Sequence, residues 1–494
     1  MTVKPVRGQT HSRRPEGEAA RRADPAVSKS RDSSRPAPRG GAAGEPRLRR
    51  RSTARRADRA APAPSGRAAA VAADESAPGR TSSPRPIPNP ARERAPVPGT
   101  RPPAVARARE PTAELTARGE RRLRTGHPWI YRTDVRRAEA EAGDIVRVVG
   151  LRGRPLGYAT FSDRSAISLR LLTHEDARPD AGFWRARIEA AVAYRDSLGI
   201  DATAYRLVHG EGDRLPGLIV DRYGESLVVQ TLTQATDRLL SVLCNLLVDA
   251  VAPAGILARN DPRVRGLEGL DQAVELRYGR VPEEVEVREG AVRLFVDPWK
   301  GQKTGLFLDQ RENRLAAARY ARGRVLDGFS YTGAFALQVA PASDAVLAVD
   351  VAESAVAAVA RHAAHNHAPH VEARAGNVFD ALRDHDRAGE RFDTVVLDPP
   401  AFAKNRKAAE RAVAGYKEIN LRALRILEPG GTLVTSSCSY HVDEPTFARI
   451  LADAAADARA DVRVVERRRQ ARDHPMLVSV PETSYLKCFV LRKL

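Results

Sequence analysis

The stretch formed by residues 323–340 constrains the fold of this chain more than any other. A short apolar run ends at Asp327, a loop over residues 328–333 follows, and a helix-forming run then extends to Pro341. This succession of strand, tight turn and helix directs backbone N–H groups at a bound ligand. The next apolar run ends at Asp350, where a carboxylate can accept hydrogen bonds from the hydroxyl groups of a ribose.

The spacing within this loop indicates which nucleotide-like ligand fits. The loop reads GFSYTG and lacks the G-x-G-x-x-G spacing that binds a dinucleotide pyrophosphate, so an NAD-linked enzyme is disfavoured. The wider turn suits a nucleoside without phosphate groups, and S-adenosylmethionine is the cofactor that we expect. A plain strand-to-helix turn with a surface aspartate is the alternative on this stretch alone.

Strands alternate with helices from about residue 286 to the end of the chain. After a hairpin, strands are expected at GRVLDG, DAVLAVD, HVEARAG, RFDTVVLD and GTLVTSSCS, and two late strands at DVRVVERR and SYLKCFVLR. This pattern predicts an α/β fold with a Rossmann-like, doubly wound parallel sheet over residues 286–494. Ligands of such sheets bind beyond the carboxyl ends of the strands, where Asp327, Asp350, Asp398 and Cys438 all lie.

Two smaller domains are expected before this sheet. Residues 112–180 alternate apolar and polar residues between glycines, which predicts short antiparallel strands and a small β-barrel. Residues 181–285 carry two helix-spaced runs around two strands, which predicts an α+β domain. Arginines around the barrel favour nucleic-acid binding and an ordinary solvated surface about equally. They are Arg132, Arg136, Arg137, Arg147, Arg152 and Arg154.

Residues 1–111 differ in composition from the rest of the chain. Up to residue 110 they contain no Phe, Trp, Tyr or Cys, and they carry 25 Lys and Arg residues against 10 Asp and Glu residues, hence 15 of the 19 net positive charges. Such a segment cannot bury enough apolar surface to offset its ordering entropy, so we expect a disordered basic tail. It could bind RNA phosphates without sequence preference, and a solvated extension or upstream sequence from a misplaced start is the alternative.

The cysteines and the hydropathy pattern indicate a compartment. Cys244, Cys438 and Cys488 are too few for a disulfide framework, so the cytoplasm is expected. The sequence contains neither the run of about 18 apolar residues that a membrane span needs nor a charged-then-apolar leader, so we expect no membrane partner. Cys244 lies in a helix-spaced apolar run and Cys488 within a strand, so both are expected to be structural.

Two polar clusters admit more than one interpretation. The cluster within residues 206–213 is denser than a turn requires, and we expect it to brace a domain interface rather than to line a cleft. It consists of Arg206, His209, Glu211 and Asp213. Four histidines between positions 362 and 370 lack the Cys or carboxylate spacing of a metal site, so no metal is expected.

Three residues near the expected edge of the sheet carry candidate chemistry. Asp398 precedes two prolines that stiffen the exit of a buried strand, and its carboxylate can accept hydrogen bonds from a planar base with amino groups. Cys438 follows the next strand and is expected to face the cleft, where nearby charge can produce a nucleophilic thiolate. Gln310, together with its neighbours Asp309 and Arg311, could cover the methionine end of the cofactor. A rigid loop, an inert thiol and a helix N-terminus are the respective alternatives.

Several motifs resemble those of known methyltransferases. The segments VLDGFSYTGAFAL, AVD, LDPPAFAK and SSCSYH resemble motifs I, II, IV and VI of class I S-adenosylmethionine-dependent methyltransferases. With GHPWIYR, RLVHGEGDRLPGLIVDRYG and KTGLFLDQREN, residues 112–494 resemble the large-subunit ribosomal RNA methyltransferase I family, which makes 5-methylcytosine. The resemblance implies a PUA barrel, a central α+β domain and a C-terminal Rossmann-like methyltransferase domain, and it does not extend to the tail.

The resemblance also assigns roles to residues. Cys438 would be the nucleophile, and Asp398 would be the acid or hydrogen-bond partner of the cytosine. Asn377 stands where many class I enzymes have an acid near the adenine, and its amide can still bond the adenine edge. The expected cofactor-binding residues are Asp327, Gly328, Ser330, Tyr331, Thr332, Gly333, Asp350, Asn377, Asp398 and Gln310.

The chemistry of cytosine agrees with a covalent route. Thiolate addition at carbon 6 makes carbon 5 nucleophilic enough to take a methyl group, and the base must first leave its stack. Enzymes with a two-cysteine scheme have Pro-Cys in motif IV where this chain has Pro399-Pro400, so the group that removes the carbon 5 proton is left open.

RNA, and ribosomal RNA above all, is the expected partner, and a homodimer is left open beside a monomer. The first competing function is an RNA methyltransferase that acts on a nitrogen without a covalent step, because Asp-Pro-Pro loops also serve exocyclic amines. The second is a non-catalytic RNA-binding or ribosome assembly factor that uses the barrel and the tail.

Overall fold

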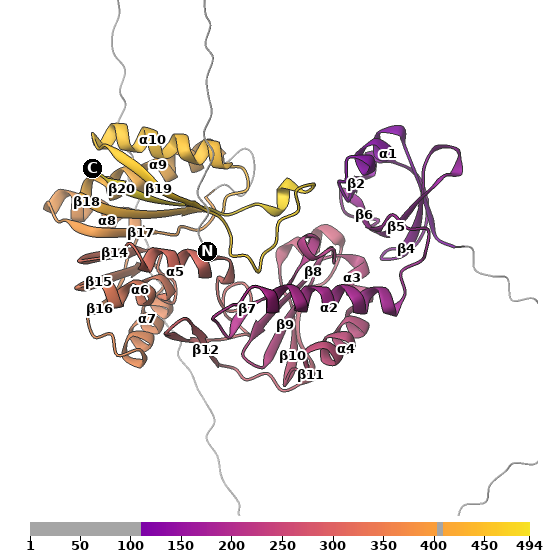
Figure 1. Ribbon diagram of the computed structural model, residues 1–494, viewed down its shortest axis with the longest axis horizontal. Coiled ribbons are helices and arrows are strands. Elements are labelled where there is room, and N and C mark those ends of the chain that lie inside the picture. The colour runs from indigo at the N-terminus through magenta and orange to yellow at the C-terminus, as the bar shows by residue number, and fades with distance from the viewer. Residues whose placement is uncertain (1–109, 403–408) are drawn as a thin grey trace, which may run out of the picture. The chain divides into compact units, whose positions relative to one another are not determined.

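The computed structural model describes residues 110–402 and 409–494, which form four β-sheets. The disordered tail expected over residues 1–111 therefore lies almost entirely outside the described residues. Figure 1 shows the described chain running from indigo to yellow.

The first sheet has six strands in the order β2-β6-β5-β4-β1-β3. Its neighbouring strands pair antiparallel, as the alternation of apolar and polar residues predicts, except that β1 and β4 are parallel. Leu115, Ile130, Val146 and Leu169 form much of its core. The elements are β1 (Thr112–Leu115), α1 (Ala117–Arg124), β2 (Trp129–Tyr131), β3 (Val135–Glu139), β4 (Ile145–Val149), β5 (Pro155–Phe161) and β6 (Ile167–Thr173).

The second sheet has five strands in the order β11-β10-β9-β8-β7. The sequence predicted the helices α2 and α4 but only two strands in the turn-rich segment, where the structure has three, and it missed β10 and β11. Cys244 is buried in α4 against this sheet, which confirms the structural role expected for it. The elements are α2 (Ala181–Ser197), β7 (Ala204–His209), β8 (Leu218–Tyr223), β9 (Ser226–Thr231), α3 (Gln234–Arg238), α4 (Leu240–Val251), β10 (Gly255–Asn260) and β11 (Ala273–Gly279).

A hairpin and a short helical segment lead into the last sheet. The hairpin that the sequence predicts forms from β12 (Val285–Glu289) and β13 (Val292–Val296). The 3-10 turn η5 (Leu308–Gln310) and the helix α5 (Arg311–Ala318) follow it.

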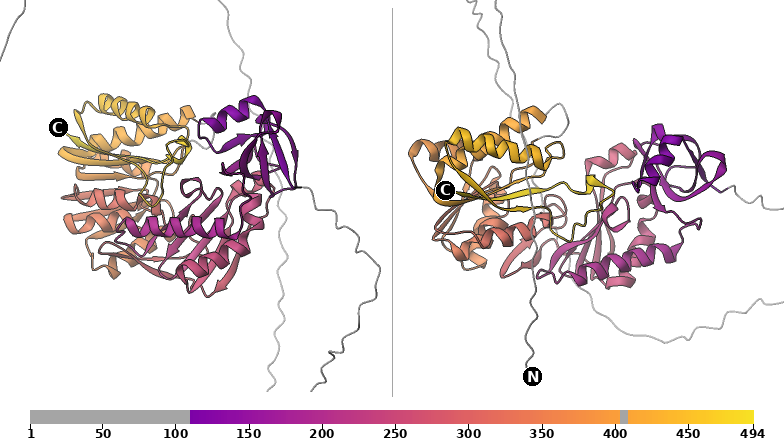
Figure 2. Two further views of the ribbon diagram at one scale, coloured as in Figure 1. Left: turned by 45° about the vertical axis from the view of Figure 1, so that its right-hand side comes forward. Right: turned by 45° about the horizontal axis from the view of Figure 1, so that its top comes forward.

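The C-terminal sheet has seven strands in the order β16-β15-β14-β17-β18-β20-β19. Helices cover both of its faces: α6 and α7 pack in one core with Val346, and α8, α9 and α10 pack in the other with Val395 (Figures 1 and 2). The strands are β14 (Arg324–Gly328), β15 (Ala345–Asp350), β16 (Val371–Ala375), β17 (Phe392–Leu397), β18 (Leu427–Ser437), β19 (Val462–Arg468) and β20 (Lys487–Lys493). The helices are α6 (Ala334–Val339), α7 (Glu353–His365), α8 (Val378–Ala388), α9 (Ala409–Ile426) and α10 (Glu444–Ala458).

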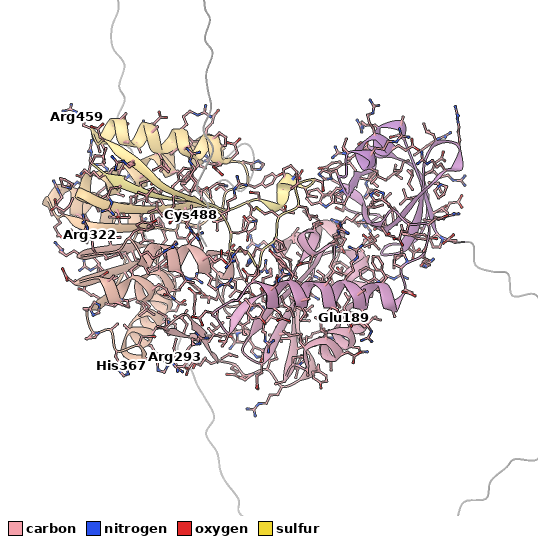
Figure 3. All side chains as sticks on the ribbon, in the orientation of Figure 1. Glu189, Arg293, Arg322, His367, Arg459 and Cys488 are labelled. Carbon is pink, nitrogen blue, oxygen red and sulfur yellow. The ribbon has the colours of Figure 1, made fainter. Side chains whose placement is uncertain are left out.

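The expected doubly wound sheet is confirmed, but it is not parallel throughout. Strands β14 to β18 pair parallel, whereas β20 runs antiparallel to both β18 and β19. Parallel neighbours need a crossover connection, usually a helix. Residues 469–486, which join β19 to β20 and are all described by the structure, contain only the 3-10 turn η8 (Pro481–Thr483), so these two strands pair antiparallel. Cys488 is buried within β20, as expected (Figure 3).

Segment 469–486 reaches back to the central domain. The Asp473 carboxylate accepts hydrogen bonds from the backbone N–H of Arg206 at 2.8 Å and from Arg311 Nη1 at 3.0 Å. Arg195 donates both to the Asp473 carbonyl at 2.6 Å and to the Asp213 carboxylate at 2.6 Å. The polar cluster within residues 206–213 therefore braces an interface, which confirms that interpretation.

Of the four histidines between positions 362 and 370, His362 has a structural role. His362 is buried, its Nε2 accepts a hydrogen bond from the Phe295 N–H at 2.9 Å, and its Nδ1 lies 2.8 Å from the Thr332 carbonyl. Among the described residues, no group of three or more His, Cys, Asp or Glu side chains could hold a metal ion. No helix in the described part of the chain is long and apolar enough to cross a membrane.

Candidate functional site

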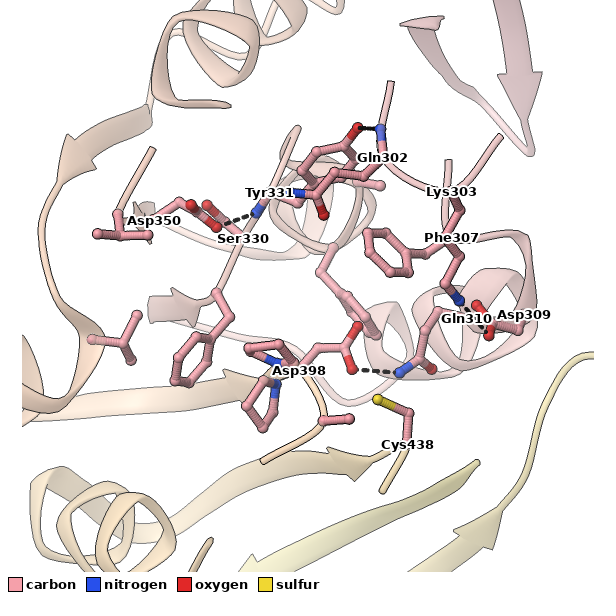
Figure 4. A pocket seen from close by; sticks show the side chains of 18 of the residues that line it. Gln302, Lys303, Phe307, Asp309, Gln310, Ser330, Tyr331, Asp350, Asp398 and Cys438 are labelled. Atoms are coloured by element: carbon pink, nitrogen blue, oxygen red, sulfur yellow. Dashed lines mark hydrogen bonds and ion pairs between the residues drawn. The ribbon is translucent and has the colours of Figure 1, made fainter. Parts of the chain in front are cut away.

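A pocket of about 600 Å³ lies at the carboxyl ends of the parallel strands (Figure 4). The strand register brings these ends together, because Gly328 pairs with Val349 of β15 and Leu397 of β17, and Leu397 pairs with Thr435 of β18. Seven of the residues predicted from the sequence line the pocket. They are Gln310, Ser330, Tyr331, Asp350, Asn377, Asp398 and Cys438.

The other four predicted residues lie behind the pocket wall and support it. Asp327 is one position short of the strand end and is buried, where its Oδ2 accepts a hydrogen bond from the Ala336 N–H at 3.0 Å. Burial raises the pKa of Asp327 well above its usual range. Gly328 and Gly333 allow close packing, since a side chain would meet Val378 or Val359, and Thr332 uses its carbonyl to bond His362.

The loop after β14 has an unusual backbone. Phe329 and Tyr331 both adopt the left-handed region, with φ of 64° and 48°, which is uncommon for bulky residues and concentrates at functional sites. The Tyr331 N–H donates to Asp350 Oδ2 at 2.9 Å, so the loop is tied to the end of β15. The hydroxyl of Ser330 is buried and has no hydrogen-bond partner within the described residues. A bound polar ligand would satisfy it.

The helix α8, which the sequence analysis did not predict, begins at the pocket. Asn377 caps it by accepting a hydrogen bond from the Phe379 N–H at 2.9 Å, so the Nδ2 group of Asn377 is the donor that a ligand would use. An aromatic wall continues from this point. The rings of Phe329, Phe379 and Phe402 lie 5.7–6.3 Å apart and offer an apolar surface to a flat ring.

Asp398 lies just past β17 in a partly buried position. Its Oδ1 accepts a hydrogen bond from Gln310 Nε2 at 2.6 Å, and Asn313 Nδ2 donates to Gln310 Oε1 at 2.6 Å, which fixes the orientation of the Gln310 amide. Burial, together with the nearby Asp309 carboxylate, raises the pKa of Asp398 to about 6. The group can therefore gain and lose a proton near neutral pH.

Cys438 follows β18 and is neither fully buried nor fully exposed. Burial and the Asp398 carboxylate raise the pKa of the Cys438 thiol to about 11. The backbone beside it is fixed, because Lys487 Nζ donates to the Ser439 carbonyl at 2.8 Å and Ser439 Oγ lies 2.9 Å from Tyr416 Oη. Burial also lowers the pKa of Lys487 to about 8.

A second carboxylate, Asp309, lines the same end of the pocket as Asp398. Asp309 Oδ2 accepts from Lys303 Nζ at 3.0 Å and from the Tyr485 hydroxyl at 2.8 Å. Although burial alone would raise it, the pKa of Asp309 is held below its usual range by Lys303 and by the nearby His474. Sequence reasoning gave no role to Lys303 or Tyr485, because Tyr485 is 176 positions away from its partner and no local pattern links them.

Comparisons with known proteins give consistent findings. Residues 113–174 match the model of a PUA-like domain, and residues 206–492 match that of an S-adenosylmethionine-dependent methyltransferase. The chain is 39% identical over 384 residues to the ribosomal RNA large subunit methyltransferase I of Shewanella frigidimarina (strain NCIMB 400), covering 76% of this chain and 97% of that protein. It is 40% identical over 392 residues to the protein of the same name from Tolumonas auensis, covering 77% of this chain and 99% of the relative.

Solved structures share the fold. A candidate SAM-dependent methyltransferase from Streptococcus mutans superposes with a TM-score of 0.66 at 20% identity, over 77% of this chain and 99% of that one. SMU.776, another candidate methyltransferase, solved in complex with SAH, superposes with a TM-score of 0.68 at 21% identity and the same coverage. At this level of identity the likeness concerns the fold.

Proposed function

The chain belongs to the large-subunit ribosomal RNA methyltransferase I family of S-adenosylmethionine-dependent methyltransferases, and from that membership we propose that it methylates carbon 5 of a cytosine in large-subunit ribosomal RNA. One observation carries the proposal: Cys438 and Asp398 line the same pocket as the loop that precedes α6. A nucleophile, a proton carrier and a cofactor loop thus share one cavity.

The residues at one end of the pocket fit S-adenosylmethionine. Asp350 would accept hydrogen bonds from the ribose, Asn377 Nδ2 would bond the adenine edge, and the buried hydroxyl of Ser330 would gain its missing partner. Phe379 and Phe402 would contact the adenine ring. When bound there, S-adenosylmethionine would supply an electrophilic methyl group on a positively charged sulfur.

The other end of the pocket would hold the flipped cytosine. Asp398 takes the proton of the Cys438 thiol and passes it to N3 of the base, while the sulfur bonds to carbon 6. As that bond forms, the electrons of the carbon 5–carbon 6 double bond shift towards carbon 4 and the protonated N3, and carbon 5 of the resulting enamine takes the methyl group. Loss of the carbon 5 proton to a base then re-forms the carbon 5–carbon 6 double bond and expels the thiolate, and N3 returns its proton through Asp398 to the sulfur.

The raised pKa values of the two groups fit this exchange. At neutral pH the Asp398 carboxylate is mostly ionised because its pKa is about 6, and it therefore suppresses ionisation of Cys438, whose pKa is about 11. Proton transfer from the thiol to Asp398 removes that negative charge as the thiolate forms. The thiol is thereby kept unreactive until a base is present to receive the proton.

Covalent trapping tests the proposal. The wild type is expected to form an adduct with large-subunit ribosomal RNA that contains 5-fluorocytosine, visible as a slower band on a denaturing gel, because fluorine cannot leave as a proton. Cys438→Ala should form no adduct and yet bind S-adenosylmethionine in isothermal titration calorimetry. Cys244→Ala, which changes a thiol remote from the pocket, should trap like the wild type. Full methyl transfer by Cys438→Ala would instead assign the enzyme to nitrogen methylation.

The remaining expectations about partners and place follow from this function. Large-subunit ribosomal RNA is the proposed substrate, and the cytoplasm is the proposed compartment because a free thiol nucleophile needs reducing conditions. A homodimer, which the sequence left open, would use the exposed edge strand β11 of the central sheet.

A further inference from the structure

Asp309 has a buried carboxylate oxygen that the proposed chemistry does not use. Its Oδ2 is bonded to Lys303 and Tyr485, whereas Oδ1 has no hydrogen-bond partner within the described residues. A buried acceptor left without a donor costs free energy, so such an atom in a pocket wall indicates that a ligand supplies the donor. Asp309 lines the pocket at the same end as Cys438 and Asp398 (Figure 4).

The surroundings of Asp309 make it rigid. Its backbone carbonyl accepts a hydrogen bond from the Ala471 N–H at 2.8 Å. Its side-chain Oδ2 accepts hydrogen bonds from both Lys303 and Tyr485. Asp309 therefore receives contacts from the loop that precedes its own turn and from segment 469–486. A carboxylate fixed on several sides presents its free oxygen in a defined direction, which recognition of one atom of a ligand requires.

The charge state of Asp309 determines what it can recognise. With the ammonium group of Lys303 at 3.0 Å, the carboxylate stays ionised and can only accept hydrogen bonds. A cytosine carries an amino group at carbon 4, which donates. A uracil carries an oxygen at the same position, and that oxygen would face a negative carboxylate without a proton between them.

We propose that Asp309 selects cytosine over uracil by accepting a hydrogen bond from the amino group at carbon 4. The inference rests on the proposed function, and it adds the group that reads the base. Asp398 then serves N3 of the base, while Asp309 serves the neighbouring amino group. On the edge of the cytosine, Asp398 thus exchanges a proton with N3, and Asp309 accepts a hydrogen bond from the amino group.

This division explains why the two carboxylates have opposite environments. Within the described residues, Gln310 is the side-chain hydrogen-bond donor to Asp398, and it is neutral. Lys303 and Arg314 act on Asp398 only through their charge and do not outweigh burial, so that carboxylate can take up a proton. Asp309 has a cationic partner, so it cannot readily become a donor to uracil. A site built around such a fixed acceptor rejects the isosteric base that lacks the donor, because two acceptors are then left facing each other.

The experiment compares two fluorinated bases at one position. The adduct of the wild type on 5-fluorocytosine RNA first identifies the target nucleotide, and two oligonucleotides then carry 5-fluorocytosine or 5-fluorouracil there. The wild type is expected to trap the cytosine form at least about 100-fold faster. Asp309→Asn should reduce this ratio at least about tenfold, because an amide can also turn its NH₂ group towards the uracil oxygen.

A second variant, Lys303→Met, tests the proposal independently in case Asp309→Asn fails to fold. Lys303→Met keeps the carboxylate but removes its counter-charge, so the pKa of Asp309 rises and the group can donate to uracil once it is protonated. The preference for cytosine should then fall as the pH is lowered, whereas in the wild type Asp309 stays ionised and should make no pH-dependent contribution to that preference. Asp344→Asn is the matched control, since that aspartate is exposed before β15, and it should keep the wild-type ratio.

The outcomes separate this inference from the function on which it rests. If the wild type forms no adduct on either base, both fail. If it traps cytosine while Asp309→Asn and Lys303→Met, each shown by calorimetry to bind S-adenosylmethionine, keep the wild-type ratio at every pH, cytosine methylation stands and the role of Asp309 is refuted.

Discussion

At the scale of single residues, the pocket contains two groups whose ionisations oppose each other. Asp398 and Cys438 both have raised pKa values, and the charge of Asp398 contributes to the shift of the thiol. Such a pair keeps Cys438 as the protonated thiol at neutral pH. It couples formation of the nucleophile to protonation of its neighbour, so the reactive sulfur arises only when a proton can move.

Asp398→Asn tests this coupling through two readouts that change in opposite directions. Removing the negative charge should lower the pKa of Cys438, so alkylation of this thiol by iodoacetamide should begin at lower pH than in the wild type. Methyl transfer should fall by about 10²–10⁴-fold, because the proton carrier is gone. The wild-type kcat/KM should decline below about pH 6, where Asp398 is already protonated, and the variant should lack this decline.

Mass spectrometry of the peptide containing Cys438 gives the alkylation rate at each pH. Asp393→Asn is a suitable control, because Asp393 lies in β17, the strand that precedes Asp398, and accepts a hydrogen bond from the Arg324 N–H outside the pocket. An alkylation profile that does not move in Asp398→Asn would mean that the two groups are not coupled.

Residue-scale features divide clearly into those that the sequence predicts and those that it does not. Asp350, Asp398 and Cys438 each follow an apolar run, so their place at the pocket could be expected. Asp327 also ends such a run, yet the strand register buries it one position below the edge. The pairing of Asp309 with Tyr485 depends on how segment 469–486 folds back, which no local pattern encodes.

At the scale of elements, His362 connects three parts of the C-terminal domain. It lies in α7, accepts a hydrogen bond from the Phe295 N–H of β13, and bonds the Thr332 carbonyl in the loop after β14. Because Nε2 accepts, Nδ1 must carry the proton and donate, so the ring is neutral. Burial lowers the pKa of His362, which favours this neutral form.

His362→Leu should therefore destabilise the protein and loosen the cofactor loop together. The variant leaves the Phe295 N–H and the Thr332 carbonyl, both partly buried, without these partners, which should lower the free energy of unfolding by about 2–4 kcal/mol. Urea denaturation followed by fluorescence measures this change. His367→Asn is the matched control, since His367 lies at the surface with a φ of 54°, which asparagine tolerates, and its effect should stay within about 0.5 kcal/mol (Figure 3).

The pH dependence gives this prediction a sign. A folded-state pKa below the ordinary value of 6.5 means that the stabilisation by His362 is complete above that pH and is lost as the pH falls through the folded-state pKa. The difference between wild type and His362→Leu should shrink accordingly on acidification. A difference that stays constant from pH 7 to pH 5 would contradict the hydrogen-bonding scheme.

Strands and helices that a local pattern of apolar and polar residues marks were predictable from the sequence. Those that depend on contacts between distant segments were not. Strands β14, β15, β17 and β18 are apolar runs closed by polar residues, so their existence and order followed from the alternation with helices. The direction of β20 follows from the lack of a crossover helix before it, which the apolar pattern of the strand itself does not reveal. Strand β11 is exposed along its whole length, so it lacks the buried apolar face by which a strand is recognised.

At the scale of the whole molecule, the domains are joined by buried charge. Asp473 bonds the Arg206 N–H of the central domain and the Arg311 guanidinium beside the C-terminal sheet, and both its pairing partners are largely shielded from water. The same segment supplies Tyr485 to Asp309. The element that braces the domains thus also completes the pocket, so the position of the central domain bears on the chemistry of the site.

The net charge of the chain is carried mainly by residues 1–110, which hold 25 of its 81 Lys and Arg residues and only 10 of its 62 Asp and Glu residues. Deleting residues 1–109 should weaken RNA binding and reduce the slope of log Kd against log salt by roughly 0.7–0.9 for every RNA phosphate that the tail neutralises.

Fluorescence anisotropy between low and moderate salt measures the slope, and a chain whose tail arginines are replaced by glutamine separates the effect of the charge from that of the length. That variant should behave like the deletion, because phosphates respond to charge, and methyl transfer at saturating RNA should be retained by both, because the pocket lies wholly within residues 302–486. An unchanged slope in either chain would mean that the tail neutralises no phosphates.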